Sequence, residues 1–153
     1  MRPGFLLLAL LAACGTSNTG DDGMTVDCST VTGTDTFVVG LEHQGVGGML
    51  DFKLMSIDPA PAQRGDNTWI VQVNAMASGV VGNPIDGATI GVSPYMPAHM
   101  HFSPITADIT PMADPGQYQL KPVNLWMPGV WETTITATSG SVSDRAIYKF
   151  CIE

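Results

Sequence analysis

The chain has 153 residues, of which 44% are hydrophobic and only 13% are charged, a balance typical of one compact globular domain. The formal net charge is −8, and the six Lys and Arg residues are scattered from Arg2 to Lys149. A nucleic-acid surface needs clustered basic side chains, so the composition argues against nucleic acid as a partner.

The first 13 residues have the features of an export signal. Arg2 supplies positive charge, and the apolar run from Phe5 to Ala13 is shorter than the roughly 20 residues that a membrane span needs. We therefore expect a signal peptide over residues 1–13.

Cys14 follows this apolar run directly, and the end of the run resembles a bacterial lipobox. In a lipobox the cysteine is lipidated and becomes the mature N-terminus; an ordinary signal peptide with an incidental Cys14 is the alternative. Gly15 after the cysteine is compatible with sorting to the outer membrane. The expected location is the bacterial cell envelope, with Cys14 as a lipid anchor in the membrane and the domain facing the periplasm or the cell surface.

Residues 14–35 are predicted to be a tether and an N-terminal arm, since residues 15–23 are polar and rich in Gly. Setting Cys14 aside leaves Cys28 and Cys151 at opposite ends of the remaining chain. Disulfides form in exported proteins, which predicts a Cys28–Cys151 bridge. The alternative is that one of them is a thiolate ligand, but the chain has no Cys-x-x-Cys motif and no His close to either.

From residue 36 onward the sequence predicts short β-strands separated by Gly, Pro, Asn and Asp clusters, and no helical period persists beyond two turns. The expected architecture is all-β, an antiparallel immunoglobulin-like sandwich of seven to eight strands. The candidate strands are residues 36–41, 49–57, 68–75, 88–92, 98–103, 117–125, 130–138 and 146–152.

Two motifs carry a resemblance to a known family. Met96-Pro97-Ala98-His99-Met100-His101 and the later Met127-Pro128-Gly129-Val130-Trp131 follow in an order that resembles the YtkA-like domain family. The resemblance covers roughly residues 50–138 and implies an exported or membrane-attached immunoglobulin-like sandwich, here placed at residues 36–153. Family members often have Gly between the two histidines, where this chain has Met100.

The His-x-His pair is the main candidate site. If His99 and His101 lie on one strand, both imidazoles face one side and Met100 faces the other. Met96 and Met127 precede prolines in turns that a sandwich gathers at its ends, so we expect them near the histidines; Met100 and Met112 are secondary candidates. Imidazole and thioether together favour copper, with zinc as the runner-up. The alternative interpretation has the histidines bonding loop carbonyls and the methionines packing on aromatic rings.

No catalytic arrangement emerges from the sequence, since no Ser lies in Gly-x-Ser-x-Gly and no Gly-rich loop opens a helix, so we do not expect an enzyme. The leading hypothesis is an envelope lipoprotein that stores or delivers copper. The competing hypothesis is a metal-free interaction module that contacts another envelope protein, which an exposed Trp126 would favour. His43, with no partner in the sequence, is expected on a surface loop.

Overall fold

The computed structural model of the chain describes residues 25–153, so the predicted signal peptide and Cys14 lie outside the described residues. Within that range no helix is long and apolar enough to cross a membrane. One short 3-10 helix, η1 (Cys28–Thr30), begins the described chain, with the Asp27 carboxylate accepting a hydrogen bond from the Ser29 amide at its start.

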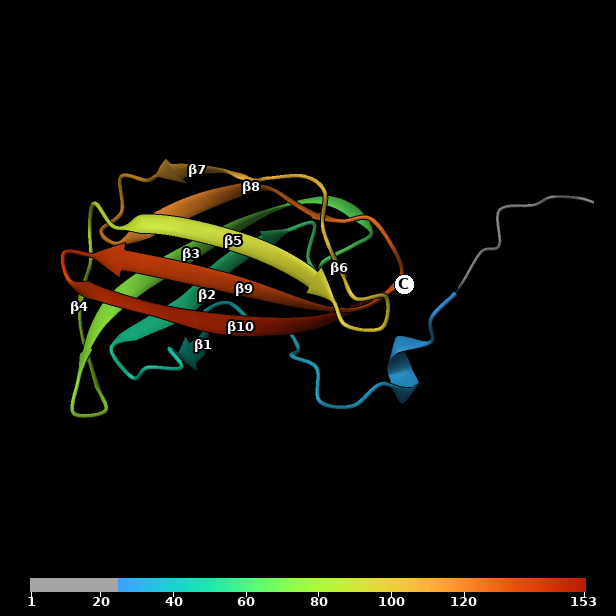
Figure 1. Cartoon of the computed structure of the whole chain (residues 1–153), viewed down its shortest axis with the longest axis horizontal. Helices are drawn as coiled ribbons and strands as arrows, with labels where there is room; N and C mark the ends of the chain where they lie inside the picture. The colour runs from blue at the N-terminus through green and yellow to red at the C-terminus, as the bar shows by residue number, and fades with distance from the viewer. Residues whose placement is uncertain (1–24) are drawn as a thin grey trace, which may run out of the picture.

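Two antiparallel sheets pack face to face, as an immunoglobulin-like sandwich predicts (Figure 1). The first sheet has the order β1-β2-β3-β8-β7, with β4 also paired to β3, and the second has the order β10-β9-β5-β6. The strands of the first sheet are β1 (Leu41–Gln44), β2 (Leu50–Asp58), β3 (Gly65–Ala77), β4 (Val80–Pro84), β7 (Asp108–Pro111) and β8 (Gln117–Leu125). Those of the second are β5 (Thr89–Met96), β6 (His101–Phe102), β9 (Gly129–Ser139) and β10 (Val142–Ile152).

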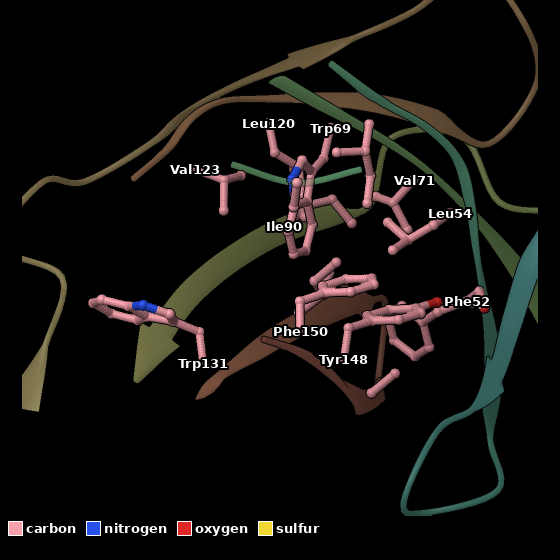
Figure 2. Close-up of a cluster of buried hydrophobic side chains, with 14 of the residues drawn as sticks. Phe52, Leu54, Trp69, Val71, Ile90, Leu120, Val123, Trp131, Tyr148 and Phe150 are labelled. Atoms are coloured by element: carbon pink, nitrogen blue, oxygen red, sulfur yellow. Dashed lines mark hydrogen bonds between the residues drawn. The ribbon is translucent and has the colours of Figure 1, made fainter. Parts of the chain in front are cut away.

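The core lies between the sheets because alternate residues of each strand point inward. On β3, Trp69, Val71 and Val73 are fully buried, and β9 and β10 present Trp131, Tyr148 and Phe150 to them. Figure 2 shows Trp69 and Val71 of the first sheet directed toward Tyr148 and Phe150 of the second, with Trp131 at one side of the cluster. The prediction of an all-β sandwich is therefore confirmed.

The N-terminal arm covers the outer edge of β10. The Asp35 amide donates to the Lys149 carbonyl over 2.7 Å, and the Lys149 amide donates to the Asp35 carboxylate over 2.8 Å. Further along the same edge, the Val46 amide donates to the Arg145 carbonyl over 2.8 Å. These contacts occupy backbone groups that an exposed edge strand would offer to other chains. The predicted disulfide is present, joining Cys28 of the arm to Cys151 of β10.

Two of the predicted strands are wrong. Residues 36–40 form an irregular segment, and the first strand starts only at Leu41, after a turn in which Gly40 adopts a φ of 81°. The prediction for residues 98–103 is also too long, since β6 contains only His101 and Phe102. The structure has two further strands that the sequence did not indicate, β4 and β7.

Candidate functional site

A tight turn, not a strand, carries His99. The His99 amide donates to the Met96 carbonyl over 3.2 Å and the Met100 amide to the Pro97 carbonyl over 3.3 Å, so the chain reverses between β5 and β6. Met100 adopts a φ of 53° at the end of this turn and is 82% exposed. The prediction that a continuous strand aligns both histidines is therefore wrong. The turn nevertheless brings the two imidazole rings to a centroid separation of 5.8 Å.

His101 lies at one end of the sandwich among aromatic side chains. It is the cross-strand partner of Met96, so the two side chains share a face of the sheet. Its ring stacks on Trp126, with centroids 5.3 Å apart and planes at 23°. The ring of Trp131 lies edge-to-face with it, with centroids 6.0 Å apart and planes at 65°. The imidazole is thus held in a fixed orientation by two indoles.

The two ring nitrogens of His101 have different surroundings. Nδ1 lies 3.3 Å from the Phe102 carbonyl oxygen, and because a carbonyl can only accept, Nδ1 carries the proton in this contact. Nε2 is then the nitrogen with the free lone pair. It is buried and has no hydrogen-bond partner among the described residues. A metal-ligating histidine commonly shows this division, with one nitrogen bonded to a carbonyl and the other bound to the ion.

The candidate thioethers occupy different places. Met96 is 1% exposed and belongs to the core, with its terminal methyl against Gly129. Met127 is half-buried and packs on the edge of the same core. Met112 follows β7 and its amide donates to the carbonyl of Gln117, at the start of β8. Because β8 ends at the His101 end of the molecule, Met112 lies at the opposite end and is not brought to the site.

The turn that presents Trp126 and Met127 is held from two sides. Arg64 Nε donates to the Trp126 carbonyl and Trp131 Nε1 donates to the Met127 carbonyl, each over 2.9 Å. The loop of Arg64 is itself fixed by Asn67, whose side chain bonds the amide and the carbonyl of Gln63. Sequence reasoning missed Arg64, because its contact spans 62 residues and no motif marks it.

Chemically, this end of the sandwich offers imidazole nitrogen and thioether sulfur. Copper(I) prefers this donor set, and copper(II) accepts imidazole with oxygen. In residues 25–153 no three His, Cys, Asp or Glu side chains come together in a group that could hold a metal ion. The potential donor atoms at this end are the imidazole nitrogens of His99 and His101 and the thioether sulfurs of the neighbouring methionines.

His43 lies in β1, contrary to the expectation of a surface loop. Its Nε2 is 3.0 Å from an Asp35 carboxylate oxygen, and its ring stacks on Tyr148 with centroids 4.5 Å apart. The same carboxylate accepts the Lys149 amide, so His43 helps to attach the arm to β10. This role is structural, and it makes His43 a useful control for the other two histidines.

A buried carboxyl lies on the opposite face of β2 from the core. Asp51 is fully buried between the core residues Leu50 and Phe52. One of its oxygens accepts the Asn74 amide over 3.0 Å, and the other has no hydrogen-bond partner within residues 25–153. Burial raises the pKa of Asp51 above its ordinary value, and the nearby Glu42 carboxylate raises it further, although the Asn74 hydrogen bond opposes the change.

We expect Asp51→Asn to increase the free energy of unfolding at pH 7 by about 1 kcal/mol. The unfolded chain ionises Asp51 at a lower pH than the folded chain does. Wild-type stability therefore falls as the pH rises from the unfolded pKa through the raised folded pKa, and the variant escapes this loss. Urea unfolding of both proteins between pH 3 and 8 measures the effect. A variant that is less stable than wild type at pH 7 would contradict it.

Comparison with known proteins gives two matches and one negative result. Among solved structures, the chain is similar to PcoC, a methionine-rich copper resistance protein from Escherichia coli, at 17% identity and a TM-score of 0.40, covering 67% of this chain and 98% of that one. At this TM-score the similarity establishes no shared function. No curated protein matches the sequence. The family model described as YtkA-like matches residues 48–136, which include β2 to β8 and most of β9. Since this match covers more than half of the sequence, the chain belongs to the YtkA-like family.

Proposed function

We propose that the protein is an envelope lipoprotein that binds copper at the end of the sandwich formed by β6 and the turn after β8, for storage or delivery and not for catalysis. His101 and His99 provide the imidazole ligands. Met127 provides a thioether at the edge of the core, and the buried Met96, the cross-strand partner of His101, provides a second sulfur. The lipid anchor of this proposal is Cys14.

The observation that carries the proposal is the state of His101 Nε2. A buried polar atom without a hydrogen-bond partner costs free energy, and such atoms are rare in folded proteins. Here the partnerless atom is an imidazole lone pair, on a ring that Trp126 and the Phe102 carbonyl hold in place. A copper ion at Nε2 would satisfy this atom, and the second imidazole lies close enough to contribute after a small side-chain rotation.

We expect His101→Ala to weaken copper(I) binding by about two orders of magnitude, because the substitution removes a ligand and not only its support. His99→Ala should weaken it less, since His99 lies in an exposed turn and its ring is free to reorient. Titration against a chromogenic copper(I) chelator measures both effects, with copper(II) titrated separately.

The matched control is His43→Ala, which removes the third imidazole of the described chain from a position bonded to Asp35. Its copper affinity should equal that of wild type. Equal and weak binding by all the variants and by wild type, with every protein folded by circular dichroism, would contradict the proposal.

A second candidate function is a metal-free interaction module. The specific observation in its favour is Trp126, which is 41% exposed although it also stacks on His101. A large aromatic side chain on the surface is a common feature of binding sites for other macromolecules. In that case the histidine and methionine variants would leave partner binding intact, and Trp126→Ala would weaken it.

A further inference from the structure

The N-terminal arm leaves the sandwich at the same end as the candidate copper site. The disulfide fixes Cys28 to Cys151 at the end of β10, where Ile152 pairs with Gly129. Gly129 starts β9 immediately after the turn of Trp126 and Met127. Figure 1 shows η1, the C-terminus and the β6 turn together at this end of the molecule. We name it the β6 end and define it by the turn 97–105 and the turn 126–128.

The β6 end exposes large apolar side chains. Met100 and Phe102 are 82% and 61% exposed, and Ile105 and Trp126 are 44% and 41% exposed. Phe102 packs one side of its ring on Tyr95, with centroids 4.8 Å apart, and presents the other to solvent. Soluble surfaces rarely gather such side chains without a binding role.

The two turns of the β6 end have no charged residue, although the chain has a net charge of −8 and other charged groups lie nearby. Glu132 pairs with Tyr95 and forms an ion pair with Lys149, and Glu153 follows Ile152 at the end of β10. Between Asp86 and Asp108 the sequence has no Asp, Glu, Lys or Arg, and this stretch includes all of β5, β6 and the turn 97–105. The turn 126–128 has no charged residue of its own, and Arg64, from another loop, donates a hydrogen bond from its Nε to the Trp126 carbonyl. The surface around His101 can therefore approach an apolar medium without having to bury ionised groups of its own turns.

We propose that the β6 end rests on the lipid bilayer, with Trp126, Met100, Phe102 and Ile105 at the level of the headgroups. Trp is enriched at this depth because its ring is apolar and its N–H can stay hydrated. This inference goes beyond copper binding and rests on the lipid anchor at Cys14. It would place the copper site at the membrane surface.

The position of the arm supports a bilayer over other occupants. At full extension, the residues from Cys14 to Cys28 reach no more than about 50 Å. Because this segment starts from the β6 end, that end has the highest effective concentration at the membrane. The opposite end of the sandwich would have to reach the bilayer past strands of about 30–36 Å in length, which the tether permits only when nearly extended.

Tryptophan fluorescence in brominated vesicles tests the orientation, since bromine on the acyl chains quenches only indoles close to them. Trp69 and Trp131 are fully buried, so Trp126 is the tryptophan that lipid can reach. We expect the full-length lipidated protein, metal-free and reconstituted into phosphatidylcholine vesicles, to lose emission when the lipid is brominated. The loss should be unchanged by salt, because the contacting turns lack charged residues.

Three variants make the test specific. Trp126→Phe should abolish the bromine-dependent loss. Met100→Ser with Phe102→Ser retains Trp126 and should reduce the loss clearly, because the remaining contact area is smaller. The matched control is Met49→Ser with Val80→Ser, which removes two exposed hydrophobic residues near the opposite end of the sandwich and should leave the loss unchanged.

The outcomes separate this inference from the copper proposal. A protein that fails to float with the vesicles has no anchor, and the orientation is then wrong. Flotation without bromine-dependent quenching also overturns the orientation, and it directs the exposed residues toward a protein partner instead. Copper titration of the same samples is independent of both results, so a failure of the copper site would leave the quenching result unaffected.

Discussion

Replacing both half-cystines, as Cys28→Ser with Cys151→Ser, should lower the free energy of unfolding by about 3 kcal/mol. The two cysteines are 123 positions apart, and closing a loop of that length restricts the unfolded chain strongly, with about 5 kcal/mol as the upper figure. Without the bridge the folded state also gains conformational freedom, so the expected loss of stability is smaller than this upper figure. Residues 25–34 regain freedom, whereas Asp35 stays attached to Lys149 through two hydrogen bonds.

Thermal unfolding measures this effect, and a loss of 3 kcal/mol corresponds to a Tm lower by about 10 °C for a domain of this size. Wild type reduced with dithiothreitol should unfold like the double variant, and the variant itself should not respond to the reductant. If reduction leaves the Tm of wild type unchanged, the bridge does not stabilise the fold by constraining the unfolded chain.

The sequence predicted the long strands well because burial and backbone preference agree in them. The prediction for residues 117–125 coincides with β8, and β2, β3 and β9 were predicted to within three residues at each end. Each has large apolar residues recurring mostly at alternate positions, which fit a pleated surface with one buried face. Trp69 and Trp131 lie at the inward positions of such strands and are both fully buried.

The incorrect strand predictions concern segments whose conformation is not determined by their local sequence. Residues 36–40 include Thr36, Phe37 and two valines, yet they lie outside both sheets, where the arm crosses toward β1. β4 ends in Gly82-Asn83-Pro84, a sequence typical of a turn. This segment is a strand because β3 extends past the end of its pairing with β8, and the extended part of β3 pairs with β4. In both cases a distant segment determines the local conformation, so the local sequence cannot indicate it.

The sequence predicted which segments meet at the candidate site better than it predicted the burial and orientation of their side chains. The Met-Pro-x-His-x-His and Met-Pro-Gly-x-Trp motifs do come together, through the stacking of His101 on Trp126 and the Trp131–Met127 hydrogen bond. The burial of His101 Nε2 could not be read from the motif, because it depends on indoles 25 and 30 positions further along the chain. The core position of Met96 follows from its pairing in β5, which the sequence left open.

The largest effect of a single charge is expected at Asp144 on β10, which fixes the turn between β1 and β2. Its carboxylate accepts the amides of Gly47, Met49, Leu50 and Arg145, at 2.7, 2.8, 3.1 and 2.8 Å. Gly45 is needed beside it, because a β-carbon there would overlap the carboxylate. We expect Asp144→Asn to lower the free energy of unfolding by about 3 kcal/mol, because an amide nitrogen replaces one acceptor and faces backbone donors.

The pH dependence identifies the cause of this loss. Burial alone raises the pKa of Asp144, but the four amide hydrogen bonds outweigh it and hold the pKa below its ordinary value of 3.8. The folded chain therefore keeps this carboxylate ionised at a pH where the unfolded chain protonates it. The stability from Asp144 is complete well above pH 3.8 and disappears as the pH falls through the folded pKa.

Urea unfolding of wild type and Asp144→Asn between pH 2 and 7 should accordingly give two curves that converge toward acid. The sign is opposite to that expected at Asp51, whose raised pKa makes its ionised form unfavourable in the fold. The control is Asp108→Asn, which replaces an exposed carboxylate on β7 and should leave the free energy of unfolding at pH 7 equal to that of wild type. A constant difference between Asp144→Asn and wild type across this range would mean that packing of the turn, and not the ionised carboxylate, stabilises the fold.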